Sequence, residues 1–274
     1  MDTSNSFSEF YESSNLFHGS LMHAMGTRLD VIIVGPDKNI SMICWEKIEN
    51  EICRLSHLFN KFDERSELYK INQKAGHSPV RVGNELWTVL MDCKQYFNMT
   101  SGYFDISLKD YNQVILDIKK QTVFFQDGQI QLDLGAYAKG YALEKIRDIL
   151  NDQKVDCALV NFGNSSVLAL GSHPHGDYWP IGIEDPYNPQ NTLGIVELVD
   201  NTLSTSGNMP SHAKHIFDPH TGTYTEAKKI VSVKAVNAID AEALSTTLMI
   251  IPDELVKSVL SNFILDEYLS FDIQ

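Results

Sequence analysis

The chain has few of the features that would place it in a membrane or in an oxidising compartment. It contains four cysteines among 274 residues, and none has the C-x-x-C spacing of metal or redox sites. Buried free thiols are therefore expected, and neither a disulfide framework nor a zinc centre. No apolar run reaches the ~20 residues of a membrane-spanning helix. The first 20 residues are polar, without a basic start, an apolar signal core or a cysteine for lipidation, so we expect a cytoplasmic protein.

Positive charge is also scarce. Lys and Arg number 22 against 36 Asp and Glu, which gives a formal net charge of −14. A field of that sign repels polyanions, so the composition argues against nucleic acid and anionic membranes as partners. A small phosphorylated ligand remains compatible with the sequence, provided that backbone N–H groups or a metal ion offset the field locally.

Several catalytic motifs are missing as well. The sequence has no Gly-x-Ser-x-Gly elbow, no paired catalytic Cys and His, and no phosphate-binding Walker loop. Covalent serine hydrolysis and P-loop nucleotide chemistry are therefore excluded as functions of this chain.

The apolar pattern predicts helices early in the chain and strands later. Apolar residues spaced by three and four predict helices over about 44–62 and 84–100. From residue 154 onward, short β-branched segments bounded by Gly, Pro, Asn or Asp predict strands. This order indicates an α+β fold. With no repeat and no clear linker, we expect one compact domain over 18–274, preceded by a polar tail over 1–17.

The segment 131–145 is the most informative stretch. A predicted hairpin joins 122–125 to 130–134 through an Asp-Gly turn, and the chain then breaks at Gly135-Ala136 and continues as a helix. Such a break leaves free carbonyl and N–H groups side by side, which suit a hard cation and a phosphate respectively. Lys139 adds a charge one turn into the helix and Asp133 an acceptor before it. An ordinary strand–helix turn with glycines for close packing is the alternative interpretation.

A second candidate site lies on a helix predicted over 238–250. Glu242, Ser245 and Thr246 stand at i, i+3 and i+4, so they share one helix face. One carboxylate and two hydroxyls form an all-oxygen set that suits Mg²⁺ or Ca²⁺ better than zinc, and a carbonyl from the break near Ala136 would add a ligand. The alternative is a solvated helix face whose hydroxyls bond to the helix backbone.

Two further segments contain candidate polar groups. His215 precedes a rigid Asp-Pro-His-Thr-Gly turn over 218–222, where it is a candidate general base or phosphate contact. A surface histidine without function is equally compatible with the sequence. The hydroxyls and N–H groups of 204–207 are either an anion-binding turn or simply the end of a strand.

Taken in order along the chain, these segments resemble one known family. The segments that carry the resemblance are Met25-Gly-Thr27, Phe59…Ser66-Glu67…Asn72, Gly102-Tyr-Phe-Asp105, Leu132-Asp-Leu-Gly-Ala-Tyr-Ala-Lys-Gly-Tyr-Ala142, Ala158-Leu-Val-Asn-Phe-Gly163, Trp179-Pro-Ile-Gly-Ile-Glu-Asp-Pro186, Ser204-Thr-Ser-Gly207, His215-Ile-Phe-Asp-Pro-His-Thr-Gly222 and Ala241-Glu-Ala-Leu-Ser-Thr246. The series resembles the FAD:protein FMN transferase (ApbE) family over about residues 18–272.

The resemblance implies a T-fold-like α+β domain with antiparallel sheets and flanking helices, which binds FAD with Mg²⁺. It implies transfer of FMN to a threonine hydroxyl in an exposed motif of an acceptor flavoprotein, with release of AMP. Two alternatives stay open: an FAD pyrophosphatase, and a non-catalytic flavin-binding relative. The latter is suggested by Glu242, which stands where the family usually has Asp, and by Asn164-Ser165, which stand where it has Gly-Asp.

The resemblance also implies the role of individual residues. His215 matches the histidine to which a catalytic role is attributed. The implied metal ligands are the carbonyl of Ala136 and the side chains of Glu242, Ser245 and Thr246. The implied FAD contacts are Met25, Phe62, Tyr103, Phe104, Asp105, Asp133, Lys139 and Ile216.

Overall fold

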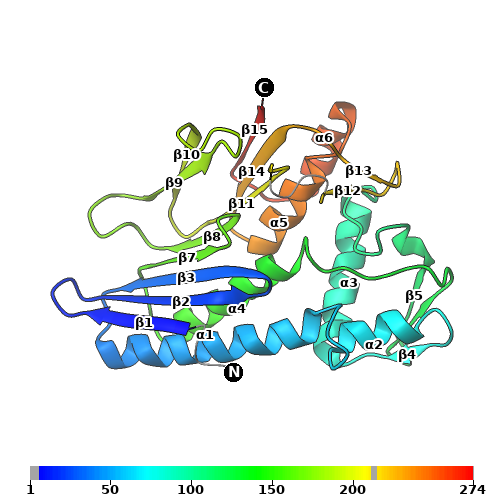
Figure 1. Ribbon diagram of the computed structural model, residues 1–274, viewed down its shortest axis with the longest axis horizontal. Coiled ribbons are helices and arrows are strands. Elements are labelled where there is room, and N and C mark those ends of the chain that lie inside the picture. The colour runs from blue at the N-terminus through cyan, green and yellow to red at the C-terminus, as the bar shows by residue number, and fades with distance from the viewer. Residues whose placement is uncertain (1–5, 211–214, 274) are drawn as a thin grey trace.

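A computed structural model describes residues 6–210 and 215–273, and one large antiparallel sheet dominates it (Figure 1). Its eight strands, in spatial order, are β1 (Ser6–Tyr11), β2 (Leu16–Ala24), β3 (Thr27–Val34), β7 (Ala158–Phe162), β8 (Ser166–Leu170), β11 (Thr202–Gly207), β14 (Lys229–Ala235) and β15 (Glu267–Asp272). Every neighbouring pair is antiparallel. The mixture of helices with antiparallel sheets confirms the predicted α+β class.

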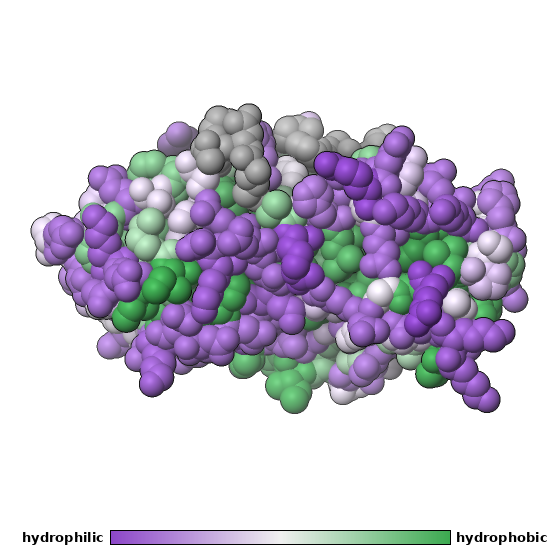
Figure 2. Space-filling model, turned by 90° about the horizontal axis from the view of Figure 1, so that it is seen from below, coloured by the Kyte–Doolittle hydropathy of each residue, from purple (hydrophilic) through white to green (hydrophobic). Residues whose placement is uncertain are grey.

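Six helices accompany this sheet: α1 (Lys38–Phe59), α2 (Glu67–Lys74), α3 (Asn84–Met99), α4 (Ala138–Asp152), α5 (Ala238–Thr247) and α6 (Asp253–Leu260). The predicted apolar stripe of α1 is buried: Trp45, Ile48 and Ile52 are each at most 2% exposed. Figure 1 shows α1 running beneath β1, β2 and β3. The outward face along α1 is largely hydrophilic (Figure 2), as expected of an amphipathic surface helix.

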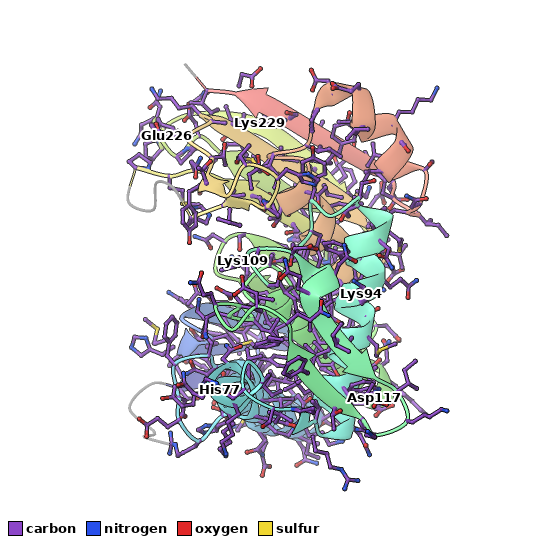
Figure 3. The ribbon with its side chains drawn as sticks, turned by 90° about the vertical axis from the view of Figure 1, so that its right-hand side faces the viewer. His77, Lys94, Lys109, Asp117, Glu226 and Lys229 are labelled. Atoms are coloured by element: carbon purple, nitrogen blue, oxygen red, sulfur yellow. The ribbon has the colours of Figure 1, made fainter. Side chains whose placement is uncertain are left out.

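Three small sheets complete the fold. They are β4 (Val80–Arg81) with β6 (Thr122–Phe125) and β5 (Val114–Asp117), β9 (Trp179–Glu184) with β10 (Thr192–Leu198), and β12 (Phe217–Asp218) with β13 (Thr223–Tyr224). A 3-10 turn, Tyr111–Gln113, precedes β5. In Figure 3, Lys94 on α3 lies at mid-height, between Lys229 of β14 above and Asp117 of β5 below.

The predicted hairpin of 122–125 with 130–134 is wrong. Strand β6 pairs instead with the preceding β5 and with β4. Residues 130–134 form no strand, because their backbone groups are bonded elsewhere. Leu132 N donates to the Asn72 side chain at 2.8 Å and Leu132 O accepts from the same amide at 2.9 Å, while Asp133 N donates to Ile106 O at 2.7 Å.

The N-terminal segment differs from the expected polar tail. Residues 1–5 lie outside the described residues, but Ser6–Tyr11 forms β1 and pairs along its length with β2. β2 itself begins at Leu16, within the predicted tail. The polar composition of this segment therefore reflects an edge strand of the main sheet, most of whose side chains face solvent.

Two other expectations concern cysteines and membrane spans. All four cysteines are free; Cys44 and Cys93 are buried, and Cys53 and Cys157 are partly buried. Within residues 6–210 and 215–273, no helix combines the length and the apolar character needed to cross a bilayer.

Helices α4 and α5 approach each other closely, and Gly140 permits it. A Cβ atom added at Gly140 would lie 2.7 Å from the Ala238 carbonyl oxygen and 2.9 Å from the Ile239 Cα. Both atoms belong to the first turn of α5, whose backbone has little freedom to move away. The glycine therefore sets the distance between the two helices that carry the predicted site residues.

We predict that Gly140→Ala destabilises the protein by about 1–3 kcal/mol because of this overpacking. The sign is diagnostic, since alanine in place of glycine inside an unobstructed helix stabilises by about 0.5–1 kcal/mol. Equilibrium urea unfolding measures the change. Gly176→Ala, where a new Cβ would meet no atom closer than 3.9 Å, is the matched control and is expected to have little effect. A stabilised Gly140→Ala protein would contradict the interpretation.

Candidate active site around Glu242

Helix α5 places Glu242 in the interior, against the main sheet. Asn237 caps the helix, its side chain accepting from the N–H groups of Ile239 and Asp240. The helix packs against β11, β14 and α4, and it is buried on almost every side. Only 4% of Glu242 is exposed. An interior carboxylate must have charged or hydrogen-bonding partners, because an unpaired one is very costly to desolvate.

Those partners come from three other elements. Glu242 Oε1 accepts from Lys139 Nζ of α4 at 2.9 Å. Glu242 Oε2 accepts from the hydroxyls of Ser166 on β8, at 2.7 Å, and Ser204 on β11, at 2.9 Å. Lys139 Nζ also donates to Ser165 Oγ at 2.5 Å and to Ser166 Oγ at 3.0 Å. The predicted ligand Glu242 and the predicted FAD contact Lys139 are thus in direct contact.

A row of hydroxyls continues from Glu242 along α5. Ser245 Oγ lies 3.0 Å from Ser204 Oγ and 2.9 Å from Ser206 Oγ. Ser206 Oγ in turn lies 3.3 Å from Thr246 Oγ1. The three predicted side-chain ligands Glu242, Ser245 and Thr246 are therefore bridged by β11.

The serines of β11 were missed as site residues by the sequence analysis. The segment 204–207 was expected to be either an anion-binding turn or the end of a strand, and it is a regular strand whose backbone pairs with β14. Its alternation was the available signal: Ser204 and Ser206 face α5, whereas Thr205 bonds to Ser232 Oγ at 2.8 Å. Ser166 gave no comparable signal, because it reaches Glu242 only through the pairing of β8 with β11.

The turn that contains Met25 borders the same region. Gly163, with φ of +67°, lies so close to this turn that an added Cβ would be 2.6 Å from Thr27 Oγ1. Gly163 N donates to Arg28 O at 2.8 Å, and Thr205 N donates to Ser165 O at 2.7 Å. The turn after β7 therefore connects the Met25 turn to the Lys139 partner Ser165.

A second ion pair lies in the segment just before α4. Asp133 Oδ2 accepts from Lys61 Nζ at 2.6 Å, and Asp133 Oδ1 accepts from Gly135 N at 2.8 Å. Phe62 is 80% exposed, with Lys61 Nζ 5.0 Å from the centre of its ring. Ala136 is partly buried in the same segment. Asp133 and Ala136 thus lie in the segment just before α4, the helix that carries Lys139.

The remaining predicted FAD contacts fall into two groups. Tyr103 and Ile216 pack in one apolar cluster, and the His220 ring stacks on Tyr103 with ring centres 4.1 Å apart. Phe104 is only 2% exposed and packs against Tyr96. The predicted catalytic residue, His215, is exposed on the segment leading into Ile216.

The Asp105 carboxylate is occupied by its own loop. It accepts from Ser107 N at 2.7 Å, Ser107 Oγ at 2.6 Å and Tyr111 N at 3.0 Å. Burial raises the pKa of Asp105, against the opposing effect of these hydrogen bonds. In this structure Phe104 and Asp105 hold the loop after α3 in shape, and Tyr103 is itself buried, at 8% exposure, beneath the His220 ring.

The donor set around Glu242 fits a hard cation. Glu242, Ser245 and Thr246 present oxygen atoms only, which suit Mg²⁺ or Ca²⁺. Both Glu242 oxygens already have protein partners, so a bound cation would have to replace Lys139 or a serine hydroxyl. Across residues 6–210 and 215–273, no group of three or more His, Cys, Asp or Glu side chains is placed to hold a metal ion.

Sheet, helices and site together define a single-domain α+β protein whose buried, hydroxyl-lined carboxylate lies between an antiparallel sheet and two helices. A sequence model described as the ApbE family matches residues 25–113 and 107–266. The chain therefore belongs to the ApbE family.

Relatives with names and solved structures agree with this assignment. The FAD:protein FMN transferase of Klebsiella pneumoniae (strain 342) is 27% identical, over 67% of this chain and 67% of the relative. That of Escherichia coli (strain K12) is 24% identical over 86% and 79%. The ApbE protein of Thermotoga maritima superposes with a TM-score of 0.77 at 23% identity, covering 94% of this chain and 90% of the other. The Pseudomonas stutzeri flavinyl transferase ApbE gives 0.75 at 22%, covering 99% and 96%.

We predict that Glu242→Gln destabilises the fold by about 3 kcal/mol, because it leaves the Lys139 ammonium without its carboxylate in a largely buried position. Asp133→Asn is the matched control, since it removes the charge from the more exposed pair with Lys61. A loss within about 1 kcal/mol is expected there. Urea unfolding of both variants measures the two losses of stability. Equal losses would contradict the prediction, because the buried Glu242–Lys139 pair would then be no costlier to break than the more exposed pair.

We also predict that stability falls as pH rises from about 4, because burial raises the pKa of Asp92, Asp105 and Asp240. A raised native pKa means that the native state binds more protons than the unfolded chain above the ordinary carboxyl pKa, so deprotonation favours unfolding. Asp92→Asn should flatten this decline, since an amide oxygen can still accept from Tyr137. Thermal unfolding from pH 4 to pH 8 tests it. Asp127→Asn, where a lysine lowers the carboxyl pKa, should not flatten the decline.

Proposed function

We propose that this protein transfers FMN from FAD to a threonine hydroxyl of an acceptor flavoprotein, in a reaction that requires Mg²⁺ and releases AMP. The observation that carries the proposal is the buried Glu242 with Lys139 and a row of hydroxyls beside it, in a chain of the ApbE family. Relatives named FAD:protein FMN transferase support the reaction class.

The residues of the site supply charge and hold the reacting groups in position. Glu242, Ser245 and Thr246, with the Ala136 carbonyl, would hold Mg²⁺. When bound, Mg²⁺ neutralises the negative charge that develops on the diphosphate as the anhydride bond breaks. Lys139, whose ammonium lies against Glu242, adds positive charge on the same side. No protein nucleophile is needed, because the acceptor supplies the hydroxyl and the site supplies its position.

The reaction balances as a substitution at phosphorus. The acceptor oxygen forms a bond to the phosphorus of the FMN half, the bond from that phosphorus to the bridging oxygen breaks, and AMP leaves with the electron pair. The hydroxyl proton passes to a base, and His215 is the candidate because it is exposed beside Ile216, next to the cluster that contains Tyr103. The aromatic faces of Tyr103 and Phe62 would stack on the two ring systems of FAD.

The acceptor and the location complete the proposal. The acceptor would present its threonine on an exposed segment, and two of the residues proposed to act on FAD or the hydroxyl, His215 and Phe62, are themselves exposed. The cytoplasmic location expected from the sequence stays a prediction.

We predict that incubation with FAD, Mg²⁺ and a candidate flavoprotein subunit gives a fluorescent protein band that survives denaturing electrophoresis. Glu242→Ala should reduce labelling by about 10²-fold or more, since it removes electrostatic stabilisation of the transition state. Thr246→Ala should raise the Mg²⁺ concentration needed for half-maximal labelling and should change FAD binding less. Glu46→Ala, on the exposed side of α1, should label normally.

The same experiment separates the alternative functions. AMP release without acceptor, abolished by Glu242→Ala, would indicate an FAD pyrophosphatase in which water replaces the threonine. Tight FAD binding with neither label nor AMP would indicate a non-catalytic flavin-binding protein. Either result would contradict the transferase proposal.

A further inference from the structure

Lys139 occupies one of the positions that a cation bound to Glu242 would take. Its ammonium nitrogen is 2.9 Å from Glu242 Oε1, and it also donates to the hydroxyls of Ser165 and Ser166. Three acceptors match the three protons of the ammonium group. The position beside the carboxylate is therefore filled by a positive charge from the protein itself.

This pair is sequestered from solvent, unlike most ion pairs in the protein. The exposed fractions of the side chains are 22% for Lys139 and 6% for Glu242. Among the ion pairs formed by residues 6–210 and 215–273, Lys139 pairs with one carboxylate, that of Glu242. Solvent screens such a pair weakly, so the net charge of the site controls which ions can enter it.

The net charge of the site around Lys139 and Glu242 changes with each ligand that binds. Lys139 and Glu242 together contribute zero. A divalent cation alone would bring the site to about +2, and a diphosphate alone to about −2, whereas the two together restore neutrality. Net charge is costly in a buried position. Binding of the cation alone or of the diphosphate alone is therefore disfavoured, whereas binding of both together is not.

We propose that Lys139 makes cation binding at Glu242 conditional on the dinucleotide. Without FAD, the ammonium holds the carboxylate and excludes a divalent cation. When the diphosphate arrives, Lys139 turns from Glu242 towards the phosphate oxygens, and the cation takes its place on the carboxylate. The inference rests on the proposed function for the identity of the dinucleotide, and it adds obligatory coupling between the two ligands.

The hydroxyls around the pair make this exchange feasible. Ser166 and Ser204 now donate to Glu242 Oε2, and each hydroxyl has lone pairs that can accept from an ammonium or coordinate a cation after rotation. Ser165 and Ser166 both accept from Lys139 in the present arrangement. No backbone movement is required for these groups to change partners.

The test measures Mn²⁺ binding to the full-length protein by electron paramagnetic resonance of the free ion, with and without FAD and with no acceptor protein. Wild-type protein should bind Mn²⁺ about 10–100-fold more tightly with FAD than without it, within the usual range of coupling between sites. Lys139→Met should bind Mn²⁺ alone about tenfold more tightly than wild type, and its coupling to FAD should nearly vanish. Lys139→Arg, which keeps the charge, should stay close to wild type in Mn²⁺ binding without FAD.

Controls keep the result interpretable. Lys145→Met removes another lysine of α4, whose ammonium lies over the Tyr141 ring and away from Glu242, and should leave Mn²⁺ binding unchanged. If Lys139→Met unfolds, Lys139→Gln keeps a hydrogen-bond donor without the charge and should show the same loss of coupling.

Two outcomes would overturn the inference. One is equal Mn²⁺ affinity with and without FAD in wild-type protein, and the other is equal Mn²⁺ affinity of wild-type protein and the Lys139 variants that lack the charge. Neither depends on labelling of an acceptor. A protein that shows the coupling but never labels an acceptor would contradict the proposed transferase and leave the coupling intact.

Discussion

The arrangement of this protein depends on one buried carboxylate. Glu242 is almost inaccessible to solvent, and a charge in that position is tolerated only with partners of good geometry. Its partners Lys139, Ser166 and Ser204 come from α4, β8 and β11, elements widely separated in sequence. The order of strands in the main sheet brings β8 beside β11, and Gly140 lets α4 approach α5. The sheet topology and one missing side chain are thus both needed to satisfy a single charge.

The sequence was sufficient to predict what depends on nearby residues. The stripe of α1 follows from its periodicity, and Glu242, Ser245 and Thr246 share a face because helical spacing requires it. It was insufficient where a group finds its partner across the fold. The segment 130–134 has the alternation of a strand, but the Asn72 amide satisfies the backbone of Leu132. Ser166 reaches Glu242 through the pairing of β8 with β11, which periodicity cannot reveal.

The segment around Tyr103 shows that residues of one motif can each be engaged by the fold itself. Asp105 accepts three hydrogen bonds from its own loop, and Phe104 is buried against Tyr96. Both hold the loop after α3, and that loop orients Tyr103. The only ring found stacked on Tyr103 among the described residues belongs to His220, on the turn that follows β12. All three residues are buried, and their partners differ: Phe104 packs against Tyr96, Asp105 accepts from its own loop, and Tyr103 packs with Ile216 and the His220 ring.

The chemistry of the hydroxyls explains how a site can be fully satisfied and still accept a ligand. A carboxylate only accepts hydrogen bonds and an ammonium only donates, so a site built from those groups alone would leave unpaired charge whenever one of them moved. Hydroxyl groups both donate and accept. Ser204 and Ser206 can therefore bond to Glu242 and Ser245 in the present state, and they can present lone pairs when the positive charge beside Glu242 changes identity. A serine-rich lining thus lets the charges rearrange without leaving a buried polar group unsatisfied in either state.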